Sequence, residues 1–297
     1  MRLTDYELLF DLPVGEYSGA GVEGTRTQTF RAGRQLEVKV FPIVRLTREA
    51  RREAKSRRSR PCVAVINALN RERYHARILE ANYTRRAIVV TLPYAYPVEE
   101  YAMCSLSEML DIYERDGLPF DVEDVQRDKR NFIARLKRRM AAAGIDPAGL
   151  KWDMTIEEGK EPPAAGLPAK YHIHAVIEGE GVTPGMIESC WGHGRTHAER
   201  FDLDDDGPMR LARYLNKQRH PGRWWSHSRN LKIPTPTVSD RKVSRRRLSL
   251  LAADIMKNGR EIMERLYPGY RIVEEPVVRY SDFVAGAYIY VRMRRRD

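Results

Sequence analysis

The chain of 297 residues has few cysteines and no long apolar run. Its three cysteines, Cys62, Cys104 and Cys190, are widely spaced. An odd number so placed argues against a disulfide framework and favours a reducing compartment. No apolar stretch approaches the ~20 residues that a membrane-spanning helix needs. The opening MRLTDYELLFDLPVG lacks the basic and apolar segments of a secretory signal. We therefore expect a cytoplasmic protein without a membrane partner.

Nucleotide-binding motifs and repeats are also missing. No G-x-x-x-x-G-K-[ST] segment occurs, which argues against a P-loop ATPase or helicase module. We find no internal repeat and no low-complexity tract. Acidic residues are in deficit, with 41 Asp and Glu against 52 Lys and Arg, so the net charge is +11. A surface this basic favours nucleic acid or anionic lipid as partner, although a basic protein without such a partner is the alternative.

Hydrophobic periodicity and turn signals predict a mixture of helices and strands. We expect a basic helical region about 47–82, a helix from Asp121 to Gly144, and helices opening at Pro184 and Pro208. A helix and strand at about 245–295 end the chain, with the long helix over about 245–267. The predicted strands lie at 36–41, 87–94, 151–159 and 170–179. This order predicts an α/β (α+β) fold over 1–297 as a single domain, with a central, mostly antiparallel sheet and flanking helices.

The strand KYHIHAVIEG carries two histidines on one face. Side chains alternate along a strand, so His172 and His174 point one way while Ile173 points to the core. The preceding strand, KWDMTIEEG, forms the other arm of a predicted hairpin and brings a carboxylate beside them. Glu157 has the phase of Asp153, and Glu158 would replace it if a bulge shifted the strand. Two imidazoles and a carboxylate predict a divalent metal site, and a pair of surface histidines is the alternative.

The helix predicted from Pro208 holds a second candidate group. Tyr214 and Lys217 are three residues apart, which places them on one face of a helix. A lysine beside a tyrosine favours the phenolate form and hence a nucleophile. Packing and a solvated charge are the ordinary explanation of the same pair. Positions 210 and 218, one turn to either side, hold no second tyrosine.

Basic and aromatic residues alternate after this helix. In RHPGRWWSHSRNLKIP, we select Arg223, Trp224, Arg229 and Lys232 as DNA contacts, together with Arg213 on the helix. Such residues hold single strands by charge and base stacking. A loop capped by core tryptophans is the alternative. The spacing Cys190-x-x-His193-x-x-x-His197 is half of a zinc site at most, and we interpret it as a loop.

In this order, the motifs resemble those of the HUH endonucleases, in particular rolling-circle replication initiator (Rep) proteins of plasmids and phages. His172-Ile173-His174 resembles the HUH motif, and TIEEG resembles the preceding acidic strand. VVTLPY is similar to the family's first motif, with Pro93 in place of the usual threonine. Tyr214-Leu215-Asn216-Lys217 looks like the catalytic Y-L-x-K. CWGHG, RWWSHSRNLKIP and TFRAGRQLEVKVFP are also similar, so the likeness runs from about residue 26 to 293.

The resemblance implies a fold similar to RNA-recognition (RRM-like) and ferredoxin-like domains. It implies a metal-dependent nickase and strand transferase acting on single-stranded origin DNA through a 5′-phosphotyrosine on Tyr214. Glu157, His172 and His174 would hold Mg²⁺ or Mn²⁺, although this ligand set also accepts zinc. A host helicase and polymerase would be partners. A relaxase- or transposase-type nickase and a non-catalytic nucleic-acid-binding protein are the alternatives.

Overall fold

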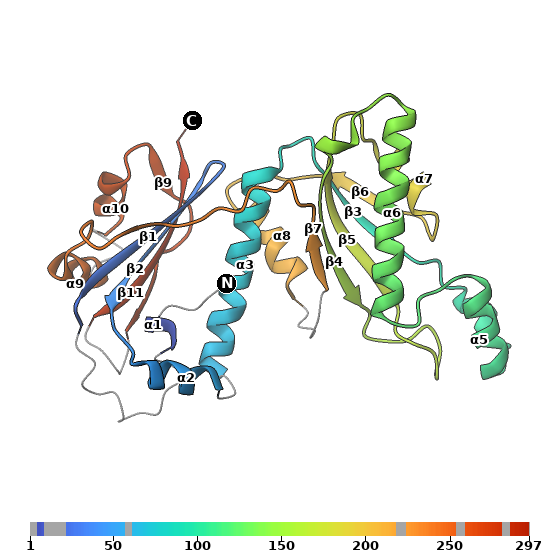
Figure 1. Ribbon diagram of the computed structural model, residues 1–297, viewed down its shortest axis with the longest axis horizontal. Coiled ribbons are helices and arrows are strands. Elements are labelled where there is room, and N and C mark those ends of the chain that lie inside the picture. Colours follow the sequence, from blue (N-terminus) through green and yellow to red (C-terminus); the bar gives the residue numbers. More distant parts are fainter. Residues whose placement is uncertain are drawn as a thin grey trace. The chain divides into compact units, whose positions relative to one another are not determined.

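The computed structural model describes residues 5–8, 22–56, 61–217, 224–253, 259–280 and 286–296 (Figure 1). The chain forms two compact units where we expected a single domain. The first unit comprises residues 1–81, 204–216 and 232–297, and the second comprises residues 82–203 and 217–231. The chain thus passes between the units, and no single break in composition marks a boundary. Each unit is considered by itself.

The second unit is built on an antiparallel sheet with the strand order β6-β3-β5-β4-β7. The strands are β3 (Ile88–Pro93), β4 (Lys151–Glu158), β5 (Tyr171–Glu178), β6 (His197–Arg200) and β7 (Trp225–His227). β4 and β5 form the predicted hairpin, and β5 lies at the centre of the sheet. The predicted alternation on these strands is confirmed, because Ile173 and Ile177 are buried in the core.

Helices cover one face of this sheet. α6 (Val122–Ala142) begins at Asp121, whose side chain accepts a hydrogen bond from the Asp124 amide, and α7 (Pro184–Trp191) is capped in the same way by Thr183. α6 lies along the sheet in Figure 1. Its stripe of Phe132, Leu136 and Met140 packs in the core beside the inward side chains of the strands. The shorter elements of the unit are α4 (Val98–Tyr101), α5 (Leu106–Arg115) and a 3-10 turn (Pro147–Gly149).

The first unit has its own antiparallel sheet, with the order β10-β11-β2-β1-β8 and with β9 paired to β11. Its strands are β1 (Gly24–Ala32), β2 (Gln35–Ile43), β8 (Thr237–Ser239), β9 (Tyr270–Ile272), β10 (Val277–Tyr280) and β11 (Ala287–Arg295). α9 (Arg245–Ala253) and α10 (Arg260–Leu266) pack on one face of it. There Leu248 and Met263 join Val38 and Val291 in an apolar core.

The opposite face of this sheet is charged although it is buried. The alternate residues of β2, Glu37 and Lys39, are at most 4% exposed. Glu37 pairs with Arg77, and Lys39 donates a hydrogen bond to Asn70. Both partners lie on α3 (Pro61–Asn82), and the unit also contains α1 (Asp5–Leu8), α2 (Arg48–Ser56) and α8 (Gly207–Leu215). α3 therefore packs on this sheet through ion pairs and hydrogen bonds.

Two long helices were expected, and in both regions the described residues are helical on either side of a short stretch that lies outside them. The basic region 47–82 contains α2 and α3, and residues 57–60 between them lie outside the described residues. The predicted helix over about 245–267 contains α9 and α10, and residues 254–258 lie outside likewise. The coarse prediction of an α+β protein with antiparallel sheets is confirmed. Within the described ranges, no helix has the length and apolar character needed to cross a membrane.

Candidate metal centre and catalytic helix

The central strand β5 places both motif histidines on the sheet face opposite the helices. Ile173 lies between them and is fully buried under α6 and α7. In the β4–β5 ladder, Glu157 is the direct partner of His172. Directly paired residues of neighbouring strands project to the same side. The hairpin register therefore brings Glu157 to the histidines and turns Glu158, which pairs with Tyr171, to the other face.

Three donor atoms converge on this face. His174 Nε2 lies 2.9 Å from Glu157 Oε2 and 3.1 Å from His172 Nε2, and His172 Nε2 lies 3.4 Å from Glu157 Oε2. The three residues form a group whose ligand atoms all lie within 4.8 Å of one another. His174 is buried, whereas the His172 side chain is 25% exposed. The group thus has one side open to solvent.

Two threonines flank His174 on the neighbouring strands, but only one contacts its ring. Thr91 on β3 and Thr155 on β4 are both direct partners of His174 in the sheet. The Thr91 hydroxyl lies 3.2 Å from His174 Nδ1. The Thr155 hydroxyl oxygen is buried and makes no hydrogen bond to any described residue. An Nδ1–H that donates to Thr91 leaves the Nε2 lone pair directed at the group.

Lys217 contacts the same carboxylate from its other side. Its Nζ lies 2.7 Å from Glu157 Oε1, while both histidines approach Oε2. The two oxygens of Glu157 are therefore divided between a lysine and the histidine pair. The sequence had placed Lys217 beside Tyr214 on one helix face, and that expectation is wrong. α8 (Gly207–Leu215) ends before Lys217, and Asn216 is its C-cap.

The local electrostatics favour a neutral histidine pair and an ionised carboxylate. Burial, and after it the neighbouring His172, lowers the pKa of His174 to about 4. Burial also lowers the pKa of His172. For Glu157, burial alone would raise the pKa, but the hydrogen bond from Lys217 and the two histidines lower it overall. Near neutral pH the group offers two imidazole nitrogens and a carboxylate oxygen, which are the protonation states that a divalent cation requires.

The donor set fits a divalent metal ion. Imidazole and carboxylate ligands suit Mn²⁺, Zn²⁺ and, with more oxygen ligands, Mg²⁺. The orientation of His174 by Thr91 is the kind of outer contact that ligating histidines have. The group therefore could hold a metal ion, and its ligands do not select one metal.

Tyr214 lies on α8, in the first unit, and its side chain is 45% exposed. Ala212 and Leu215 are among the buried residues of its helix, whereas the tyrosine lies on the outer side. At the end of the helix, the Asn216 side-chain amide lies 2.9 Å from His75 Nδ1 on α3 and donates to the Ala212 carbonyl. These contacts hold the C-terminal end of the tyrosine helix on its unit.

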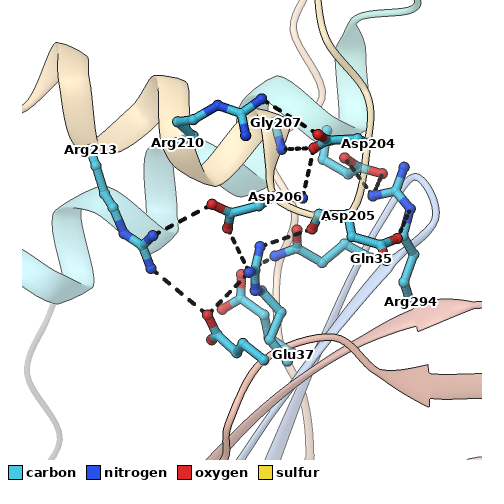
Figure 2. Close-up of polar contacts among 12 residues, drawn as sticks. Gln35, Glu37, Asp204, Asp205, Asp206, Gly207, Arg210, Arg213 and Arg294 are labelled. Atoms are coloured by element: carbon cyan, nitrogen blue, oxygen red, sulfur yellow. Dashed lines mark hydrogen bonds and ion pairs between the residues drawn. The ribbon is translucent and has the colours of Figure 1, made fainter.

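An acidic loop holds the other end of α8. Arg292 of β11 is nearly fully buried; it donates to Asp206 Oδ1 at 2.7 Å and to the Asp205 carbonyl at 3.2 Å, and it lies 3.1 Å from Glu274. Arg213 of α8 reaches both Asp206 and Glu274, at 3.7 and 3.8 Å (Figure 2). The loop before the helix and Arg213 in its last turn are thus bound to the charged face of the sheet. Sequence reasoning missed Arg292, Asp206 and Thr91, because no local pattern joins residues so far apart in the chain.

The predicted DNA contacts lie in varied surroundings. Arg229 and Lys232 are exposed, whereas Trp224 is half-buried and packs against the core of the second unit, near Tyr171. The packing of Trp224 agrees with the alternative of a tryptophan that caps the core. Arg213 is engaged in the ion pairs of α8. Arg223 lies outside the described residues.

The remaining histidine loop has an architectural role. His193 packs against Tyr94 and Trp191, and its carbonyl accepts a hydrogen bond from the Ala95 amide. The structure does not group it with His197 as a metal site among the described residues. Comparisons of the chain with protein-family models, curated proteins and solved structures find no match.

Proposed function

We propose that this protein is a rolling-circle replication initiator of HUH type, which nicks and rejoins single-stranded origin DNA. The observation that carries the proposal is the convergence of His172, His174 and Glu157 on the face of the central β5 strand that lies opposite the helices. The motif order along the sequence adds Tyr214 as nucleophile. A five-stranded antiparallel sheet with helices on one face is consistent with the RRM-like nuclease fold that the resemblance implies.

In the proposed reaction, Tyr214 Oη attacks a backbone phosphorus. A new O–P bond joins the tyrosine to the 5′-phosphate, the P–O3′ bond breaks, and the leaving oxygen takes a proton to become a free 3′-hydroxyl. The phenol proton leaves to water. Rejoining reverses these steps, with the 3′-hydroxyl as nucleophile and the tyrosine as leaving group. No net hydrolysis occurs, and the free 3′-hydroxyl can prime a host polymerase, while a host helicase would unwind the duplex.

The residues of the metal centre have distinct roles in this proposal. A divalent cation held by Glu157, His172 and His174 would supply Lewis-acid stabilisation of the charge that develops on the phosphate oxygens. Thr91 orients His174. Lys217 holds the outer oxygen of Glu157 and keeps the carboxylate ionised. These contacts preorganise the site before DNA binds, which is the requirement for electrostatic catalysis.

The test is the formation of a covalent protein–DNA adduct. The full-length protein is incubated with Mn²⁺ and a pool of random single-stranded DNA labelled at the 3′ end, because the tyrosine retains the 3′ fragment. We expect label to migrate with the wild type on a denaturing protein gel, and not with Tyr214→Phe. We also expect His172→Ala and His174→Ala to abolish metal-dependent cleavage while DNA affinity persists.

Three outcomes would contradict the proposal. Unchanged cleavage in both histidine variants would remove the metal centre from the reaction. An adduct that persists in Tyr214→Phe would assign the nucleophile to another residue. If DNA of every sequence binds without any adduct, the alternative of a non-catalytic nucleic-acid-binding protein replaces the nickase.

A further inference from the structure

The net positive charge of the chain lies in one unit. The segments of the first unit contain 33 Lys and Arg against 21 Asp and Glu, a net charge of +12. Those of the second unit contain 19 against 20, a net charge of −1, and together they give the +11 of the chain. The unit that carries the metal centre is thus nearly neutral. Attraction of a polyanion must arise mainly from the other unit.

Within the first unit, cations gather where the chain enters α9. We define the α9 patch as Arg31, Arg241, Lys242, Arg245, Arg246 and Arg247. All but the half-buried Lys242 are exposed. Arg31 belongs to β1, which α9 contacts, and its charge, after burial, lowers the pKa of Lys242. Asp240, the acidic residue at the margin, is already paired with Arg26 at 2.7 Å. No other described carboxylate forms an ion pair with the patch.

Arg245, Arg246 and Arg247 do not stabilise α9, the helix that contains them. They occupy its first turn, directly after Ser244, whose hydroxyl accepts a hydrogen bond from the Arg247 amide. Cations at a helix N-terminus oppose the macrodipole, so this position is unfavourable for them in the free protein. Lys137, Arg138 and Arg139 are also exposed and consecutive, but they lie near the C-terminal end of α6, where cations are favourable. Helix stability therefore explains the cations of α6, but it does not explain the three arginines of α9.

The surroundings of the patch indicate what kind of nucleic acid it fits. Single-strand binding surfaces combine cations with exposed aromatic rings on which bases stack. The aromatic ring at this patch is Tyr267, which is buried beneath the Lys242 ammonium at 3.8 Å. The exposed Tyr280 lies at the opposite end of α9, where its hydroxyl donates to the Ala252 carbonyl. Among the described residues, the patch presents cations without an exposed stacking ring, and such a surface suits the phosphates of a duplex.

We infer that the α9 patch is a binding surface for the phosphate backbone of double-stranded DNA, separate from the metal centre and independent of base sequence. It concerns the same DNA partner as the proposed function but uses a different set of residues. In a nickase, such a surface would anchor the protein on duplex beside the single strand to be cut.

The test measures the salt dependence of duplex binding by the full-length protein. Fluorescence anisotropy follows a labelled random-sequence 20-bp duplex between 50 and 200 mM KCl. The variant Arg245→Gln/Arg246→Gln/Arg247→Gln is compared with wild type and with Lys137→Gln/Arg138→Gln/Arg139→Gln, which removes the same charge from the second unit. We expect the first variant to lose about tenfold or more in affinity at low salt, and its log K against log [salt] slope to shrink by about 2 to 3. The control variant should stay close to wild type.

Each remaining outcome decides against the inference. Equal losses in both variants would reduce it to an effect of net charge, and an unchanged slope in the α9 variant would remove the patch from DNA binding. An equal loss on single-stranded dT20, or binding to anionic lipid vesicles but not to duplex, would assign the patch to another ligand. Failure of the adduct assay leaves this test intact, because duplex affinity is measured without cleavage.

Discussion

The two threonines beside His174 allow a prediction with a built-in control. Thr91→Val removes the hydroxyl that lies 3.2 Å from His174 Nδ1 and leaves a buried N–H without a partner. Outer contacts of ligating histidines are worth about 10- to 100-fold in metal affinity. That range corresponds to about 1.4–2.8 kcal/mol. It agrees with the ~1.5–3 kcal/mol of a hydrogen bond to a group that carries charge, as a metal-bound imidazole does.

Thr155→Val replaces a hydroxyl by a methyl group, as Thr91→Val does, at the other strand neighbour of His174. Its hydroxyl oxygen is buried without a hydrogen bond to the described residues, so its removal takes no contact from His174. We therefore expect Mn²⁺ affinity to remain within about twofold of wild type, with equal or greater stability. Isothermal titration calorimetry with Mn²⁺ on the full-length proteins measures both affinities, and urea unfolding checks that both variants are folded.

The reasoning would be refuted by either of two results. If Thr91→Val binds Mn²⁺ as tightly as wild type, the Thr91 hydroxyl does not orient His174. If Thr155→Val loses as much as Thr91→Val, the effect comes from repacking of the sheet face rather than from one hydrogen bond. A difference of at least tenfold between the two variants is the expected outcome.

The charged face of the first unit provides the other predictions. Arg292→Met removes a buried arginine from its ion pairs with the partly exposed Asp206 and Glu274. We expect urea unfolding to show a loss of about 2–3 kcal/mol in the free energy of unfolding, less than for a fully buried pair. An unchanged free energy would contradict the role of this arginine in holding α8. Arg77→Met leaves the fully buried Glu37 without its cation, so we expect a loss of about 3–5 kcal/mol, and adding Glu37→Gln should restore more than half of it because no unpaired carboxylate then stays buried. Burial lowers the pKa of Lys39 to about 8, so the unfolded chain binds more protons between pH 8 and the usual lysine pKa. Stability should therefore rise from pH 8 to 9.5, by at most about 1.4 kcal/mol per pH unit, and Lys39→Met should flatten this slope in urea titrations.

The pattern of the sequence was sufficient to predict the hairpin and the face on which Glu157 joins the two histidines. In β4 and β5 the side-chain period of two separates Ile173 and Ile177 from His172 and His174, and burial of the apolar set turns the histidines to the other side. Cap residues at Asp121 and Thr183 likewise marked the starts of α6 and α7. These features depend on neighbouring residues and on one strand pairing across a single loop, so sequence patterns are sufficient to predict them.

The tertiary structure alone decided which partners the candidate site residues have. Thr91 meets His174 across 83 positions in the chain, and Arg292 meets Asp206 across 86, distances over which no periodicity or cap signal extends. Lys217 was expected beside Tyr214, but the end of α8 at Leu215 releases it to contact Glu157. The alternation of β2 is that of a half-exposed strand, yet Glu37 and Lys39 are buried because α3 brings the opposite charges and hydrogen bonds that they need. A sequence pattern specifies which side chains share a face, whereas the element that packs on that face determines whether a charge there meets water or a partner.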